Sequence, residues 1–102
     1  MALRTLGGYL KRGINVGIGT DTYPHNMLDE IQMVAYTARI IGETADDVST
    51  QDVFNAATMG GARALRRDDI GRLSPGCRAD IVLVDLNHPA MLPGREPLRN
   101  LI

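Results

Sequence analysis

The sequence is poor in the residues that build disulfides, aromatic cores and cysteine-rich metal sites. It has one cysteine, Cys77, no tryptophan, and only 4% aromatic residues among its 102 positions. A lone cysteine excludes a disulfide framework and a cysteine-type zinc site, and it fits a reducing, cytoplasmic compartment. We therefore expect a core built from aliphatic side chains and methionine.

Strong net charge and long apolar runs are lacking as well. The formal net charge is −1, and Lys11 is the single lysine, so the chain offers no basic field to a nucleic acid. No apolar run approaches the ~18 residues that cross a membrane, and the N-terminus has no apolar signal core. We expect a cytoplasmic chain of at most one ordinary domain, with neither nucleic acid nor membrane as a partner.

The most informative stretch is residues 14–20, which end at Asp21. β-Branched residues alternate there with small ones, which favours a buried strand. Pro24 excludes further strand pairing, and Asn26 is a good residue to begin a helix. A carboxylate directly after a buried strand often points into a site at the carboxyl ends of a parallel sheet or barrel. Asp21 is thus a candidate functional residue, and an ordinary strand-end aspartate is the alternative.

Helices are predicted on both sides of this strand. Leucines at helical spacing indicate a helix over residues 2–12 that stops at Gly13. A second helix is predicted over residues 27–41, between the N-cap Asn26 and Gly42. A helix, a tight turn and a strand form the second half of a βαβ unit, so the chain is expected to begin in the middle of a fold.

A third helix has several agreeing start signals. Ser49 and Asp52 resemble a capping box, and Val48 and Val53 have the spacing of a hydrophobic staple. The pair Gly60–Gly61 interrupts the pattern. It indicates either two short helices or one helix that allows another segment to pack closely at the glycines.

The last third of the sequence is rich in turns. Residues 70–73 suggest a short strand, and the strongly apolar stretch 79–86 suggests a strand that is covered on both faces. The tail, residues 87–102, contains three prolines and is expected to be extended and to lie on the rest of the protein. Three apolar side chains are expected to be exposed at its end: Leu98, Leu101 and Ile102.

Three sequence blocks together resemble the amidohydrolase superfamily, in the branch of cytosine, guanine and adenosine-analogue deaminases and triazine hydrolases. Residues 17–21, Gly-Ile-Gly-Thr-Asp, resemble the last barrel strand with its acidic end. Residues 56–65 resemble the family's AT-x-x-GA-x-AL helix, and residues 70–85 resemble its IG-x-L-x-PG-x-x-AD-x-V-x-D return segment. Each block alone is a weak signal, but their order and separation make the match specific over nearly the whole chain.

The resemblance implies an α/β fold. Residues 1–66 would be the last helix–strand–helix segment of a (β/α)8 metal-dependent hydrolase barrel. Residues 67–102 would return as a strand or strands into a small β-sandwich domain and the barrel tail. The chain would be incomplete as a barrel on its own, so the upstream part of the same enzyme would be its partner.

The resemblance also implies a chemistry. Asp21 would bind a divalent metal, zinc or iron, and would accept a proton from the metal-bound water. The reaction would be hydrolysis of a C–N bond, a deamination or an amide or amine hydrolysis, in a cyclic or heteroaromatic small molecule. His25 and Asn26 lie on the following loop and are candidates for substrate contact; a loop histidine and a helix cap are the alternatives.

The sequence departs from the family pattern in its metal ligands. The family's His-x-His and its later single histidines have no counterpart, since the two histidines are His25 and His88. A catalytic zinc usually takes three protein ligands, so we expect the isolated chain to be inactive and to bind no metal tightly.

Two other functions are compatible with parts of the sequence. A non-catalytic α/β scaffold or interaction module would need its open strand edges covered, for example in a homo-oligomer. A nucleotide-binding loop at Gly17-x-Gly19 is disfavoured, because the third glycine is missing and Pro24 delays the helix.

Overall fold

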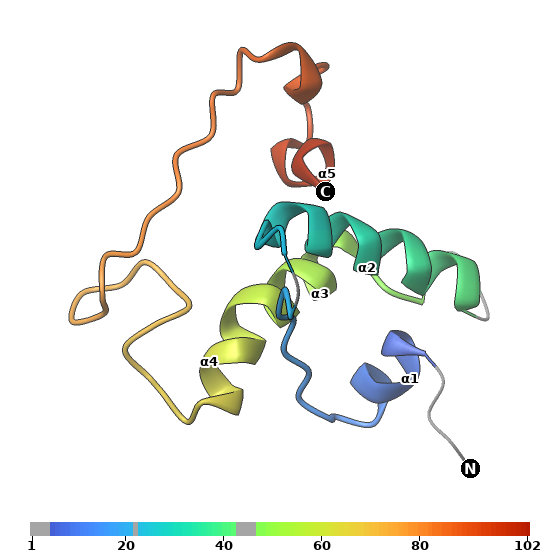
Figure 1. Cartoon of the computed structure of the whole chain (residues 1–102), viewed down its shortest axis with the longest axis vertical. Coiled ribbons are helices and arrows are strands. Elements are labelled where there is room, and N and C mark those ends of the chain that lie inside the picture. The colour runs from blue at the N-terminus through green and yellow to red at the C-terminus, as the bar shows by residue number, and fades with distance from the viewer. Residues whose placement is uncertain (1–4, 22, 43–46) are drawn as a thin grey trace.

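The structure is a computed structural model that describes residues 5–21, 23–42 and 47–102. Within these ranges the chain forms helices joined by irregular segments (Figure 1). The elements are α1 (Leu6–Lys11), α2 (Met27–Ile41), α3 (Thr50–Asn55), the π-helical turn η1 (Ala56–Gly60), α4 (Gly61–Ala64), the 3-10 turn η2 (Pro89–Met91) and α5 (Pro97–Leu101). None of these described helices combines the length and the apolar character needed to cross a membrane.

Helix α1 is shorter than the predicted helix over residues 2–12. It begins after Thr5, whose hydroxyl accepts a hydrogen bond from the amide of Gly8 at 3.0 Å. It ends before Gly13, which has a φ of +70° as expected for a glycine that terminates a helix. Residues 2–4 of the predicted helix lie outside the described ranges.

Helix α2 has the predicted bounds. The side chain of Asn26 accepts a hydrogen bond from the amide of Leu28 at 3.1 Å, and Gly42 caps the other end. Ile31, Ala35 and Ala38 form its buried face. The prediction is confirmed because every signal that sets this helix lies within it or next to it.

The predicted capping box at the third helix is also confirmed. The Ser49 hydroxyl accepts a hydrogen bond from the amide of Asp52, and the Asp52 carboxylate accepts one from the amide of Ser49. Helix α3 then runs through η1 into α4, because the residues at both junctions have helical dihedrals. Of the two alternatives at Gly60–Gly61, the structure therefore has one continuous helical run with a π-helical turn in it.

Replacing Ser49 with alanine is expected to lower the free energy of unfolding by about 1 kcal/mol, because the first turn of α3 loses its side-chain acceptor. Ser49→Thr keeps an oxygen at this position and is expected to stay within about 0.5 kcal/mol of wild type. Urea denaturation measures both values. Equal losses in the two variants would show that the hydroxyl does not act as a cap.

The core lies where α2, α3 and the end of the chain meet. Val48 and Val53, the predicted staple, are both buried there, together with Ile102 and the buried face of α2. Helix α5 lies beside α2 and α3 in Figure 1, and the side chain of Gln32 donates a hydrogen bond to the carbonyl of Leu101 at 3.2 Å.

The tail corrects two expectations. It contains two short helices, η2 and α5, rather than only extended chain, because Pro89 and Pro97 each stand at the start of a helical turn. Proline is well tolerated there, since the first helical residue needs no amide donor. Leu98, Leu101 and Ile102 were expected to be exposed, but Ile102 is buried in the core and the two leucines are partly buried against it.

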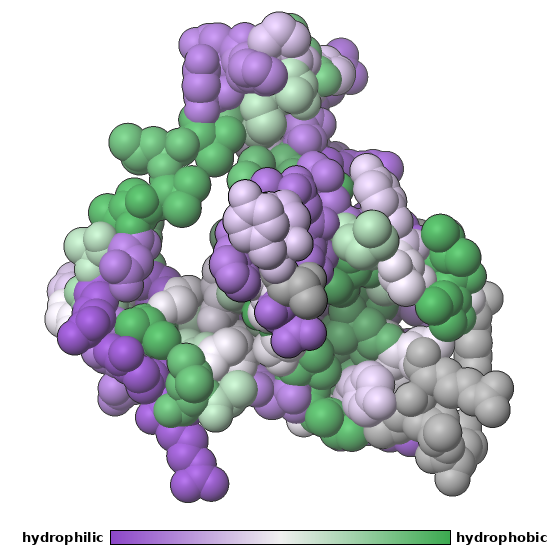
Figure 2. Space-filling model, viewed as in Figure 1, coloured by the Kyte–Doolittle hydropathy of each residue, from purple (hydrophilic) through white to green (hydrophobic). Residues whose placement is uncertain are grey.

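No β-strand is formed within the described ranges, so the predicted strands at 14–20, 70–73 and 79–86 are not observed. A strand needs a neighbour to complete its ladder of hydrogen bonds, and neither of the two longer segments pairs with the other. Residues 79–86 belong to an arc that runs from α4 to η2, away from the helices (Figure 1), and Figure 2 shows apolar surface along this arc. The expectation that both faces of this segment are covered is therefore wrong for this chain: Val82 and Leu83 are 80% and 92% exposed.

Candidate functional site

Asp21 lies between α1 and α2, directly after residues 14–20. Its side chain is exposed, and it makes no hydrogen bond or ion pair with any residue in the described part of the chain. Its φ is +50°, a left-handed conformation that aspartate tolerates better than most residues. The carboxylate is thus free to bind a ligand, and the backbone that carries it has an uncommon conformation.

His25 lies shortly after Asp21 in the sequence and contacts two neighbouring side chains. Its Nδ1 lies 3.1 Å from the hydroxyl oxygen of Thr20, and its ring contacts the ring of Tyr23 edge to face, with centroids 6.4 Å apart. Because Nδ1 is engaged by Thr20, the other ring nitrogen, Nε2, is the one available to a ligand. The order of residues in the sequence placed His25 near Asp21, but it gave no indication of the bond to Thr20.

Asn26 acts as the N-cap of α2, and its side-chain oxygen is therefore engaged by the amide of Leu28. This confirms its structural role, and its substrate contact stays a prediction.

The described residues contain no group of three histidine, cysteine, aspartate or glutamate side chains that could hold a metal ion. Asp21 nevertheless fits as one ligand, because an exposed carboxylate oxygen is a normal ligand for a divalent metal. The described residues therefore do not form a metal site by themselves, and the metal-binding role of Asp21 stays a prediction.

The segment that leads to Asp21 is bound to the helical run behind it. The amide of Ile18 donates a hydrogen bond to the carbonyl of Ala56 at 3.3 Å, and the Asn15 side chain donates one to the carbonyl of Gly60 at 2.9 Å. These acceptors are the first and last residues of η1. Asn15 was not among the predicted site residues; the only signal in the sequence was the pair Gly60–Gly61, which indicated that another segment could pack closely there.

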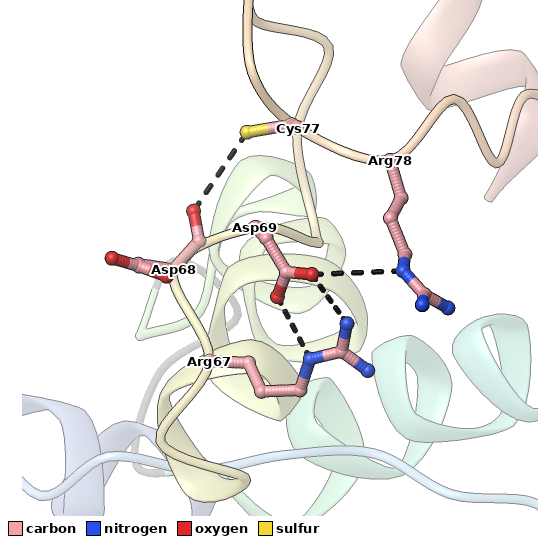
Figure 3. Close-up of polar contacts among 5 residues, drawn as sticks. All are labelled: Arg67, Asp68, Asp69, Cys77 and Arg78. Atoms are coloured by element: carbon pink, nitrogen blue, oxygen red, sulfur yellow. Dashed lines mark hydrogen bonds and ion pairs between the residues drawn. The ribbon is translucent and has the colours of Figure 1, made fainter.

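A second polar cluster lies in the turns after α4 (Figure 3). Arg67 binds both carboxylate oxygens of Asp69, and Arg78 approaches the same carboxylate at 3.6 Å. The hydrogen bonds from Arg67 lower the pKa of Asp69. The Asp69 carboxylate therefore stays ionised and paired somewhat below the ordinary pKa of an aspartate, and the pairing is lost as the pH falls through the lowered pKa. The cluster closes a turn, and its carboxylate is occupied by arginine.

An apolar cavity of about 200 Å³ opens between α1 and α2. It is lined by Thr5, Leu6, Met33, Val34, Thr37, Ala38 and Ile41. None of the predicted site residues borders it, so the cavity and the Asp21 loop are separate features.

Comparison with known proteins agrees with the sequence blocks. The chain is 42% identical over 98 residues to the 5′-deoxyadenosine deaminase of Methanosphaera stadtmanae, which covers 92% of this chain and 23% of that protein. It is 36% identical over 97 residues to the 5-methylthioadenosine/S-adenosylhomocysteine deaminase of Natronomonas pharaonis, or 91% of this chain and 22% of that protein. The chain thus spans about a fifth of the length of these curated relatives.

A solved structure is similar as well. It is the crystal structure of an adenosine deaminase from Xanthomonas campestris with bound zinc, which superposes with a TM-score of 0.85 at 34% identity. The match covers 94% of this chain and 23% of that one. The Amidohydrolase family itself matches residues 3–101. The predicted resemblance is confirmed, and the chain belongs to the amidohydrolase family.

Proposed function

We propose that this chain is the C-terminal part of a zinc-dependent deaminase that hydrolyses the exocyclic C–N bond of an adenosine derivative. The free carboxylate of Asp21, at the end of residues 14–20, is the observation that carries the proposal. The named activities of the relatives supply the substrate class: deamination of an adenosine derivative replaces an amino group on a heteroaromatic ring.

Asp21 has two roles in this proposal. The carboxylate would be one of the groups that hold the metal, and it would accept the proton that the attacking water gives up. The chemistry that a bound zinc ion would supply is a water with a pKa lowered towards ~7, which could act as the nucleophile at neutral pH. Asp21 then returns the proton to the leaving amino group, which departs as ammonia.

His25 and Asn26 contact the substrate in this proposal. The bond between Thr20 and Nδ1 fixes the imidazole ring, so Nε2 faces the ligand as donor or acceptor according to the tautomer. Asn26 has its oxygen engaged in capping α2, which leaves its side-chain nitrogen for the substrate.

The exposed arc supports the proposal that a longer chain surrounds these residues. Apolar side chains at 81–83 are uncovered on both faces of the segment, and an isolated soluble protein rarely exposes such a run. In the full-length enzyme, the barrel and the β-sandwich would supply neighbouring strands for residues 14–20 and 79–86. In this proposal, residues 1–66 belong to the barrel, and residues 67–102 return to the small β domain and the barrel tail.

The test compares the full-length enzyme with the 102-residue chain. Both are purified with zinc, and the release of ammonia from 5′-deoxyadenosine and 5-methylthioadenosine is measured. We expect turnover in the range of ordinary enzymes, about 1–10³ s⁻¹, from the full-length enzyme and none from the short chain, which lacks the other metal ligands. Turnover by the short chain, or none by the full-length enzyme on any adenosine derivative, would contradict the proposal.

A further inference from the structure

The segment before Asp21 is fixed to the helical run at both ends of one π-helical turn. The carbonyl of Ala56, at the start of η1, accepts from the amide of Ile18, and the carbonyl of Gly60, at its end, accepts from the side chain of Asn15. A π-helical turn changes the hydrogen-bond register of a helix and so can turn carbonyl groups towards a neighbouring segment. Such turns occur often at functional sites.

Gly60 allows this contact. It is buried, and a Cβ atom on it would overlap the carbonyl oxygen of Val16. The obstacle is backbone, which cannot move aside as the end of a flexible side chain can. A side chain at residue 60 would therefore push residues 15–18 away from η1.

Asp21 follows these anchors closely. A second contact spans Asp21: Thr20, just before it, bonds to His25, which directly precedes Asn26, the N-cap of α2. The left-handed Asp21 therefore lies between two fixed points, one on η1 and one on α2. Displacing residues 15–18 would move the carboxylate.

We propose that η1 positions Asp21. The absence of a side chain at Gly60 and the hydrogen bond from the side-chain amide of Asn15 set where the carboxylate lies. This inference rests on the proposed function, because it gives Asp21 a metal to bind. Gly60 and Asn15 are positioning residues, since they act through the segment that carries Asp21. Losing an outer residue that orients a metal ligand typically costs 10–100-fold in metal affinity.

The experiment measures zinc affinity of the full-length enzyme, freed of metal, by competition with a chromophoric chelator. Gly60→Ala and Asn15→Ala are each expected to raise the Kd for zinc by about 10–100-fold. Each has a matched control. A Cβ on the neighbouring Gly61 would meet nothing within 4 Å, so Gly61→Ala is expected to leave the Kd unchanged. Asn100 also donates to a backbone carbonyl, that of Met91 at 2.6 Å, but lies in α5, so Asn100→Ala is expected to leave the Kd unchanged.

The controls separate positioning from general destabilisation. Thermal unfolding is measured for all four variants, and a purely structural role would lower the melting temperature of Asn15→Ala and Asn100→Ala alike without changing zinc affinity. Wild-type zinc affinity in both Gly60→Ala and Asn15→Ala would overturn the inference, and so would an equal loss in Asn100→Ala. If Gly60→Ala does not fold, Asn15→Ala alone decides the question.

The failure of the inference can be told apart from the failure of the proposed function. An Asp21→Asn variant that binds zinc as tightly as wild type would contradict the proposed role of Asp21. A loss of zinc affinity in Asp21→Asn, without a loss in Gly60→Ala and Asn15→Ala, would contradict only the positioning role of η1.

Discussion

Replacing Asp21 with asparagine in the full-length enzyme is expected to lower kcat/KM for deamination by about 10²–10⁴-fold, the usual contribution of a positioned acid–base group. Asparagine has nearly the same shape but cannot accept the proton from the water. It also tolerates a left-handed backbone, so the φ of +50° at this position can be kept. Steady-state assays of ammonia release measure the effect, and circular dichroism checks that the fold is retained.

The matched control for this prediction is Asp29→Asn. Asp29 is exposed in the first turn of α2, a few residues from Asp21, and it is a carboxylate of the same kind. Its loss removes a favourable interaction with the helix dipole, worth about 0.3–1 kcal/mol of stability, but it should leave kcat/KM unchanged. A similar loss of activity in both variants would mean that activity depends only on negative charge in this region, and Asp21 would have no specific role.

The helices could be predicted from the sequence because their signals are local. Asn26 and Gly42 mark the ends of α2, and Ser49 with Asp52 marks the start of α3; each of these residues lies within or next to the helix that it sets. The strands could not be verified in the same way. A pattern of β-branched residues favours a strand, but the ladder requires a partner from elsewhere in a fold. For residues 14–20, the described partner is the helical turn η1 rather than a strand.

The structure of the tail was predicted less well, because proline has opposite effects on a helix at different positions. Inside a helix it breaks the structure, whereas at the first position it begins one. Pro89 and Pro97 stand at the start of η2 and α5, and the second of these helices brings Ile102 into the core. Tertiary contacts decide which of these two effects a given proline has.

The sequence indicated the candidate site residues but not the contacts between them. Asp21 was identifiable from its place after an apolar run, and its metal-binding role stays a prediction. The bonds that hold the site join residues whose relation has no local signal: Asn15 and Gly60 are 45 residues apart. Even for Thr20 and His25, which are five residues apart, no signal in the sequence indicated the hydrogen bond between them.

The largest effect on stability is expected from Ile31→Ala. Ile31 is 4% exposed on the inner face of α2, in the same cluster as Val53 and Ile102. Removing most of its side chain loses burial and leaves a cavity between α2, α3 and α5, at a cost of about 2–5 kcal/mol in the free energy of unfolding. Urea denaturation of the full-length enzyme, followed by circular dichroism, measures this loss.

A graded series at this residue tests the reason for the loss. Ile31→Val removes a single methyl group and is expected to cost about 0.5–1.5 kcal/mol, because the cavity is smaller. Equal losses in the valine and alanine variants would contradict cavity formation as the cause.

Zinc affinity provides a second readout: the bonds between residues 15–18 and η1 do not involve Ile31, so the folded Ile31→Ala enzyme should bind zinc as tightly as wild type. Packing of the core by α2 and positioning of Asp21 by η1 would then be separate contributions.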